Sequence, residues 1–279
     1  MQNSPYTLIQ PQNPRSCVVF SSPHSGMEYP ADFLAVSRLD MLAIRSSEDA
    51  FVDELFADAP VFGAPLLAAR MPRAYVDVNR GVDELDPALI TGLNAVANNP
   101  RVAAGLGVVP RVVGNRQVIR SGKITMAEVD RRIAEGYIPY HACLAELMET
   151  HLEKYGISVL MDCHSMPHAA SRHDADIVIG DRFGASCSAW ISGIVVGVFK
   201  EAGFSVARNM PFSGGYITHK YGRPARNMHA VQIEINRSLY MDEAKMTRHA
   251  NYQELRAVFT VITKALAEIG CACTCLAAE

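Results

Sequence analysis

The chain has 279 residues, of which 49% are hydrophobic and 20% charged, and its formal net charge is −3. These values are typical of an ordinary globular protein and exclude the basic surface of a nucleic-acid-binding protein. No apolar run approaches the roughly 20 residues of a membrane span, and the N-terminus lacks the pattern of a secretion signal. We therefore expect a cytoplasmic protein without a membrane partner.

Seven cysteines are an odd number, which argues against a closed disulfide framework. Four lie in or beside apolar segments, and we expect them in the core as small apolar residues: Cys17, Cys143, Cys163 and Cys187. The other three form a C-terminal cluster with single-residue gaps: Cys271, Cys273 and Cys275. That spacing is too tight for the usual zinc pattern of two pairs, so we give the cluster no role.

Short, apolar and β-branched runs predict strands that are covered on both faces. In chain order these strands are 17–21, 64–69, 74–78, 157–161, 176–179, 204–207 and 231–235. Helical spacing of apolar residues predicts helices between them, at 49–56, 125–155 with an interruption at Pro139, 186–201 and 242–269. Thr125, with Glu128 three residues later, predicts an N-cap.

Alternation of strands and helices indicates an α/β fold, with a central sheet flanked by helices. No linker divides the chain, so we expect a single domain over residues 1–279. The segment 94–120 is rich in Gly, Asn and Val with weak periodicity, and we interpret it as an excursion or lid.

Two histidines follow apolar strands. His164 ends the run Ile157–Cys163, and His24 follows Cys17–Ser22. Because open α/β folds place their active sites at the carboxyl ends of strands, both side chains are expected at one edge of the sheet. A catalytic zinc takes three His or carboxylate ligands and leaves one position open. Each histidine alone could instead be a satisfied core residue.

The third metal ligand should be a carboxylate on a rigid element. Glu48 and Asp49 stand in a row at the start of the predicted helix 49–56, and the choice between them stays open from the residues alone. We choose Asp49, because the apolar residues after it fix the helix face. The alternative for Asp49 is a helix cap.

Glu234 lies inside an apolar strand, where an isolated charge is too costly unless it is paired or functional. Side chains alternate along a strand, so Gln232, Glu234 and Asn236 should share one face. Zinc hydrolases need a carboxylate beside the metal to take and return a proton, and Glu234 fits that role. A salt bridge to an arginine is the alternative.

Arg80 and Arg237 follow predicted strands and could hold a substrate carboxylate with their planar guanidinium groups. Asn79 directly precedes Arg80 and is expected to take part. The alternative for each arginine is a structural ion pair. Gly215 and Tyr216 belong to a glycine-bearing loop that is either a flap over the site or a plain turn.

Serine or cysteine chemistry is the competing mechanism. Cys163 adjoins His164, but neighbouring residues of a strand point to opposite faces, so they form no natural dyad. The chain contains no Gly-x-Ser-x-Gly motif, no phosphate-binding loop and no dinucleotide fingerprint.

Several motifs in order resemble the N-formylglutamate amidohydrolases of histidine degradation. They are Ser22-Pro-His-Ser-Gly26, Asp77-Val-Asn-Arg80, Asp162-Cys-His-Ser165, Gly214-Gly-Tyr-Ile217 and Glu234-Ile-Asn-Arg-Ser-Leu-Tyr240. The resemblance spans roughly Val18 to Tyr240. It implies a fold like the zinc carboxypeptidases, of the phosphorylase/hydrolase type, with a mixed, mostly parallel sheet.

The resemblance also implies hydrolysis of N-formyl-L-glutamate to formate and L-glutamate, with one Zn²⁺ or another divalent ion per chain. At the matching positions His24, Asp49 and His164 become metal ligands, and Glu234 the general base. Asn79, Arg80, Arg237, Gly215 and Tyr216 become substrate-binding residues. The alternatives are a carboxypeptidase- or deacylase-like hydrolase of another N-acyl amino acid or peptide, and a non-catalytic binding protein. The oligomeric state is left open.

Overall fold

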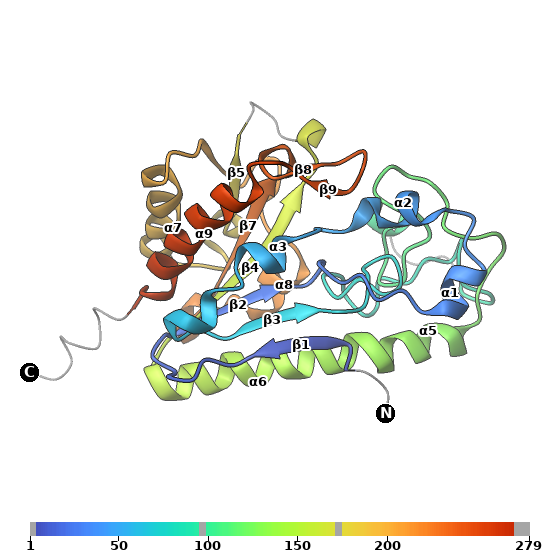
Figure 1. Ribbon diagram of the computed structural model, residues 1–279. Helices are drawn as coiled ribbons and strands as arrows, with labels where there is room; N and C mark the ends of the chain where they lie inside the picture. Colours follow the sequence, from blue (N-terminus) through green and yellow to red (C-terminus); the bar gives the residue numbers. More distant parts are fainter. Residues whose placement is uncertain (1–3, 95–98, 171–174, 271–279) are drawn as a thin grey trace, which may run out of the picture. The chain divides into compact units, whose positions relative to one another are not determined.

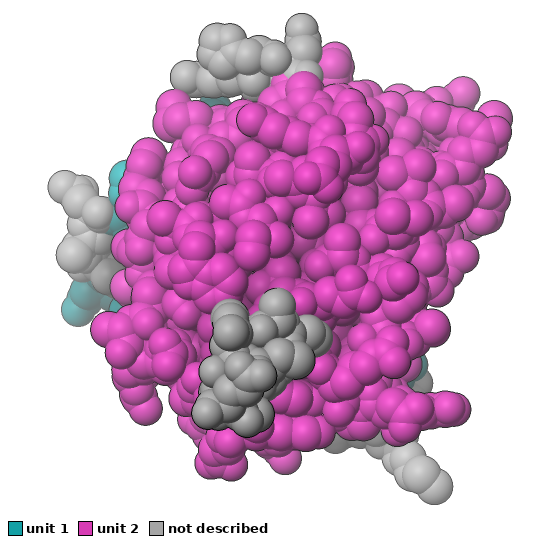
Figure 2. All heavy atoms as spheres, turned by 90° about the vertical axis from the view of Figure 1, so that its left-hand side faces the viewer, with its two compact units in different colours: residues 1–7, 23–48, 69–143 teal, residues 8–22, 49–68, 144–279 magenta. Residues whose placement is uncertain are grey.

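The protein is described here by a computed structural model that covers residues 4–94, 99–170 and 175–270 (Figure 1). It divides into two compact units, coloured separately in Figure 2. Unit 1 comprises Met1–Thr7, Pro23–Glu48 and Ala69–Cys143, and unit 2 comprises Leu8–Ser22, Asp49–Ala68 and Leu144–Glu279. Beside this division, the single domain expected over residues 1–279 stays a prediction.

The central sheet has seven strands in the order β1-β3-β2-β4-β7-β5-β6. Their bounds are β1 Tyr6–Ile9, β2 Val18–Ser22, β3 Leu66–Ala69, β4 Ser158–Met166, β5 Ile177–Gly180, β6 Val206–Arg208 and β7 Met228–Asn236. β2 pairs in parallel with β3 and β4, β4 with β7, and β5 with β6, whereas β5 and β7 are antiparallel. This mixed, mostly parallel sheet confirms the predicted α/β fold class.

Strands β4 and β7 form the centre of unit 2, and all nine residues of each are buried. Met161 and Cys163 of β4, together with Ile233 and Ile235 of β7, belong to the main apolar core. Because side chains alternate along a strand, the residues between them face the other way. One face of this strand pair is therefore apolar, and the other is free to carry polar groups.

Three helices of unit 2 contribute to the core on the apolar face: α3 Val52–Leu55, α7 Ala189–Glu201 and α9 Tyr252–Ala267. α7 and α9 pack against one another, as Figure 1 shows, and α3 packs against α9. α8, Tyr216–Tyr221, contacts β7 and β4. α6, Ile138–Tyr155, begins in unit 1 and continues into unit 2.

Unit 1 holds the short helices α1 Ala31–Ala35, α2 Met41–Ile44 and α4 Pro100–Ala103, and the longer α5 Met126–Arg132. The Thr125 side chain accepts a hydrogen bond from Glu128 N at 3.2 Å, which confirms the predicted cap. The predicted interruption at Pro139 takes the form of a π-helical segment, Ile133–Tyr137, just before α6. The wider turn accommodates a proline that has no N–H to donate, so the helical path continues.

Three sequence predictions of local structure were wrong. Residues 74–78 are not a strand, because Tyr75 N and Val76 N both bond back to Pro72 O and close a turn. The last helix begins only at Tyr252, since a small hairpin of β8 Met241–Asp242 and β9 Thr247–Arg248 precedes it. The helix expected at 49–56 is reduced to α3, because Phe51 takes a left-handed conformation with φ 65°.

The four cysteines expected in the core are buried free thiols, as predicted. Cys271, Cys273 and Cys275 lie outside the described residues. Within the described ranges, every helix is too short or too polar to cross a membrane. Residues 95–98 of the predicted lid are also outside the description, and the lid stays a prediction.

The aromatic cluster around α9 generates a test of the core. Phe259 is fully buried, and its ring contacts Phe56, Phe199 and Phe204 with centroids 5.5, 6.1 and 6.0 Å away. We expect Phe259→Ala to lower the free energy of unfolding by about 3–5 kcal/mol, because it leaves a cavity among these rings. Val261 on the same helix is 68% exposed, so Val261→Ala should change stability by less than about 0.5 kcal/mol. Urea unfolding of both variants tests this, and equal losses would contradict the assigned core.

Candidate functional site

The polar face of the β4–β7 pair carries several buried titratable groups of unit 2. His164 of β4 pairs directly with Glu234 of β7, and Asp162 pairs with Gln232. Gln232 Nε2 donates to Glu234 Oε1 at 2.6 Å. The prediction that Gln232 and Glu234 share one face is therefore confirmed, and His164 is their direct neighbour across the strands.

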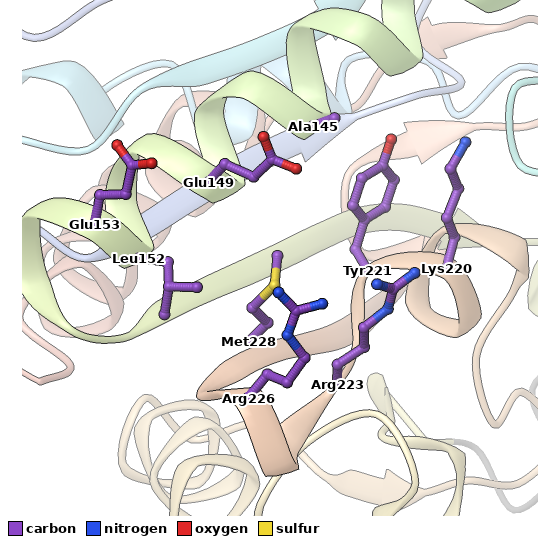
Figure 3. A pocket seen from close by; sticks show the side chains of 9 residues that line it. All are labelled: Ala145, Glu149, Leu152, Glu153, Lys220, Tyr221, Arg223, Arg226 and Met228. Atoms are coloured by element: carbon purple, nitrogen blue, oxygen red, sulfur yellow. The ribbon is translucent and has the colours of Figure 1, made fainter.

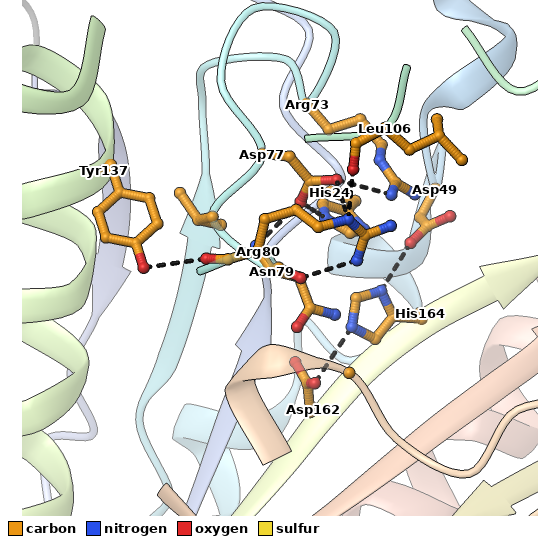
Figure 4. Close-up of polar contacts among 12 residues, drawn as sticks. His24, Asp49, Arg73, Asp77, Asn79, Arg80, Leu106, Tyr137, Asp162 and His164 are labelled. Atoms are coloured by element: carbon orange, nitrogen blue, oxygen red, sulfur yellow. Dashed lines mark hydrogen bonds and ion pairs between the residues drawn. The ribbon is translucent and has the colours of Figure 1, made fainter. Parts of the chain in front are cut away.

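His164 lies between two carboxylates of unit 2. Its Nδ1 is 2.9 Å from Asp49 Oδ2, and its Nε2 is 3.2 Å from Asp162 Oδ2, as Figure 4 shows. Asp162 is completely buried, and within the described residues neither of its oxygens accepts a hydrogen bond of good geometry. The imidazole of His164 is thus the group that balances this buried charge.

Both neighbours act on the acidity of His164. Burial alone would lower the pKa of His164, but the carboxylates of Asp162 and Asp49 outweigh it and raise the pKa well above its usual value. While no metal ion is bound, the two carboxylates therefore favour the protonated form of the imidazole. A metal ion at Nδ1 would have to displace that proton, so binding would be coupled to proton release.

Asp49 is held from its other side as well. Its Oδ1 accepts a hydrogen bond from Ser165 Oγ at 3.1 Å and lies 3.1 Å from Arg237 Nη2. Arg237 Nε in turn donates to Ser165 Oγ at 3.0 Å. The alternative interpretation of Asp49 as a helix cap was wrong, because the N-cap of α3 is Phe51. Arg237 fixes Asp49, and a contact of Arg237 with substrate stays a prediction.

The glycine-bearing loop is anchored to the same face. Gly215 N donates to Gln232 Oε1 at 2.7 Å, which also orients the Gln232 amide towards Glu234. Gly214 has φ 127°, a conformation that favours glycine. Tyr216 begins α8 directly after this turn. The attachment at Gly215 limits any flap movement at that end of the loop.

In unit 1, His24 has a carboxylate partner of its own. His24 Nε2 is 2.7 Å from Asp77 Oδ1, and Asp77 Oδ2 is 2.8 Å from Arg73 Nη2. Burial would raise the pKa of Asp77, but Arg73, His24 and Arg80 hold it well below its usual range. Asn79 N also donates to Asp77 Oδ1 at 2.9 Å. Asp77 is thus an anionic anchor that orients His24 and the Asn79 backbone.

Arg80 is 8% exposed and fixed by carbonyl groups of unit 1. Its Nε donates to Leu106 O and its Nη1 to Asn79 O, each at 2.9 Å (Figure 4). Asp77 Oδ2 lies 4.0 Å from Arg80 Nε. Burial lowers the pKa of Arg80 below its usual value, and Asp77 partly opposes this. These contacts support the alternative that Arg80 is a structural partner of Asp77. Its role in substrate binding stays a prediction.

The contacts of Glu48 and Asp49 favour Asp49 as the carboxylate ligand of the predicted metal site. Glu48 accepts a hydrogen bond from Tyr29 Oη at 2.7 Å and pairs with Arg45 Nε at 3.0 Å, whereas Asp49 meets His164. His24 of unit 1 is buried, as are Asp49 and His164 of unit 2, and each of the three side chains offers an atom that can bind a metal ion.

Sequence reasoning missed the roles of Asp162 and Asp77. The signal for Asp162 was present, because a carboxylate two residues before His164 in an apolar strand shares its face. Asp77 gave a weaker signal, since its contact with His24 joins positions far apart in the chain.

The family model described as N-formylglutamate amidohydrolase matches residues 16–241. The N-formylglutamate deformylase of Pseudomonas putida is 30% identical over 82% of this chain and 83% of its own length, and that of Pseudomonas aeruginosa is 31% identical over 81% and 82%.

Two solved structures share the fold. The crystal structure of N-formylglutamate amidohydrolase from Ralstonia eutropha JMP134 matches with a TM-score of 0.90 and 37% identity, covering 96% of this chain and 98% of that one. The gene product Atu2144 from Agrobacterium tumefaciens matches with a TM-score of 0.64 and 18% identity over 96% of each chain, which shows the fold alone. By the matched span and by this similarity, the chain belongs to the N-formylglutamate amidohydrolase family.

Proposed function

We propose that this protein hydrolyses N-formyl-L-glutamate to formate and L-glutamate, with one Zn²⁺ held by His24, Asp49 and His164 and with Glu234 as the general base. Membership of the family supports the reaction, because relatives of 30% and 31% identity are named N-formylglutamate deformylases. The proposal includes a cytoplasmic location and a role in histidine degradation.

The observation that carries the proposal is the direct pairing of His164 with Glu234. Neighbouring residues of paired strands on one face lie about 5 Å apart, which places a ligand and a base next to one another. Asp49 Oδ2 lies 2.9 Å from His164 Nδ1, so Asp49 would supply a carboxylate ligand beside that ring nitrogen. Both strands deliver these groups near their carboxyl ends, where α/β enzymes bind their ligands.

The donor set suits zinc. Two imidazoles and one carboxylate are a common catalytic set that leaves a fourth position open. Asp162 and Asp77 would each hold the distal nitrogen of one histidine, as carboxylates do behind metal-bound histidines. His24 follows the end of β2 by two residues, and β2 runs parallel beside β4 with Ser21 opposite Asp162. The continuity of the chain therefore supports His24 as the third ligand.

Each residue then has a defined task. A bound Zn²⁺ would polarise the formyl carbonyl and make water more acidic. Glu234 takes the proton of the attacking water and returns it to the leaving amine, and Gln232 orients the carboxylate that does so. Arg80 and Asn79, with Arg237, Gly215 and Tyr216, would surround the glutamate part of the substrate.

A metal experiment tests this function. We expect zinc-loaded protein to release formate from N-formyl-L-glutamate, metal-free protein to lose this activity, and added Zn²⁺ to restore it. N-acetyl-L-glutamate and longer N-acyl amino acids serve as comparison substrates, because a preference for them would favour the deacylase alternative. Full activity of the metal-free protein would refute the metal mechanism, and zinc binding without turnover of any substrate would favour a binding protein.

Glu234→Gln should separate catalysis from metal binding. The amide keeps the shape of the side chain but cannot accept a proton, so we expect kcat to fall about 10²–10⁴-fold with zinc content unchanged. Glu201→Gln, at an exposed glutamate at the end of α7, is the control and should leave kcat as it is. Near-parental turnover of Glu234→Gln would mean that another group is the base.

Asp162→Asn tests the support of His164. The neutral amide no longer balances the imidazole at 3.2 Å, so we expect zinc affinity to fall about 10–100-fold in a chelator competition assay. Cys163→Ala is the matched control, since Cys163 faces the apolar core and should affect stability while zinc affinity is kept. If Asp162→Asn, shown to be folded by circular dichroism, binds zinc like the parent, Asp162 has no part in the metal centre.

A further inference from the structure

A cavity lies within unit 2, away from the residues assigned to catalysis. It has a volume of about 380 Å³ and is enclosed by the C-terminal half of α6, the end of α8 and the start of β7 (Figure 3). That volume is at the lower end of the range for small-molecule sites, which suits a ligand of amino-acid size.

One wall of the cavity is anionic. Glu149 and Glu153 stand four residues apart on α6, both exposed, and Figure 3 shows both carboxylates on the same side. Like charges at this spacing on a helix repel one another. Within the described residues neither carboxylate forms an ion pair.

The opposite wall is cationic. Arg223 precedes and Arg226 ends a short 3-10 turn, Pro224–Arg226, and the described residues contain no ion pair to either guanidinium. Lys220, at the end of α8, lies over the rings of Tyr216 and Tyr221, with Nζ 5.6 Å from each centroid. The two walls have opposite charges, and in the described part of the chain Glu149 and Glu153 form no ion pair with Arg223 or Arg226.

The floor between the walls is apolar. Leu152 of α6 and Met228 of β7 lie between the charged groups, and Tyr221 closes one side (Figure 3). Such a floor takes the carbon chain of a ligand, while its charged ends reach the walls. The cavity therefore fits a small molecule that carries an ammonium group for the anionic wall and carboxylates for the cationic wall.

We propose that this cavity binds a free acidic amino acid as its zwitterion, and that L-glutamate is such a ligand. The lining has three cationic and two anionic side chains, which matches the two carboxylates and one ammonium of L-glutamate. The choice of L-glutamate rests on the proposed function, because it is the product of that reaction.

The same charges discriminate product from substrate. An N-formyl group turns the ammonium into a neutral amide, so the substrate has nothing to offer Glu149 and Glu153. Hydrolysis restores the ammonium and creates the charge pattern that the cavity complements. The cavity is thus suited to the amino acid that leaves the active site and poorly suited to the molecule that enters it.

The cavity is separate from the catalytic residues of β7. Met228 begins β7 and Glu234 lies six residues further, a distance of about 20 Å along an extended strand. Arg223 and Arg226 line the cavity at the amino end of β7, where Arg223 bridges to Met228. They are not at the carboxyl end, where Glu234 and Arg237 lie.

Isothermal titration of the zinc-loaded full chain with L-glutamate and with glutarate, which lacks the ammonium, tests the proposal. The double variant Arg223→Gln/Arg226→Gln should weaken binding of both ligands at this site at least tenfold, because each ligand loses charge-assisted hydrogen bonds. The double variant Glu149→Gln/Glu153→Gln should weaken only L-glutamate, by about tenfold. Both variants should keep the parental kcat and KM for formate release, which shows that the active site is unaltered.

Lys264→Gln and Glu201→Gln, at exposed residues outside the cavity, are controls for charge alone and should bind L-glutamate like the parent. Unchanged L-glutamate binding in both double variants would overturn the proposal, and so would equal weakening of glutarate by the glutamate variant. If the parent protein releases no formate but the double variants still lose L-glutamate binding, the cavity remains a glutamate site and only the proposed function is refuted. If formate release is normal and the double variants bind L-glutamate like the parent, the proposed function stands and the cavity proposal is refuted.

Discussion

The pairing of β4 with β7 imposes the central constraint on this protein, because both strands are buried along all nine residues and still carry charged side chains. Alternation sends Cys163 and Ile233 into the apolar core and sends His164 and Glu234 to the opposite face. A charge buried in this way is costly unless another charge or a hydrogen bond compensates it. The contacts of Asp49 with Arg237, Ser165 and His164 supply that compensation in unit 2.

The strands that form the sheet were the most predictable part of the fold. Runs such as 157–161 and 231–235 are rich in apolar, β-branched residues; the first overlaps β4 and the second lies inside β7. The run 74–78 has the same composition but forms a turn, because its backbone groups bond to Pro72 and its burial comes from tertiary packing. The composition of a segment thus predicted that it is buried, but it did not predict which backbone groups would form hydrogen bonds with it. β1 was missed because its half-exposed edge pattern is weak.

The candidate site was predictable where a residue type conflicted with its surroundings. A histidine or a carboxylate that ends or interrupts an apolar strand stands out, which is why His164 and Glu234 could be named from the sequence. The partners of such residues could be found only when they share a strand, as Asp162 does with His164. Arg237 illustrates the limit: its chemistry suits a substrate carboxylate, but its distance of 3.1 Å to Asp49 shows a carboxylate of the protein itself in its fork.

The two ends of β7 handle charge in different ways. Near its carboxyl end, carboxylates, an imidazole and a guanidinium contact one another, so the arrangement is fixed before any ligand arrives. At its amino end, Glu149 and Glu153 face Arg223 and Arg226 across about 380 Å³ of space without an ion pair among the described residues. Preorganised charges suit catalysis, because they need little reorganisation during the reaction. Separated charges suit reversible binding, because a ligand gains electrostatic energy there without breaking an existing salt bridge.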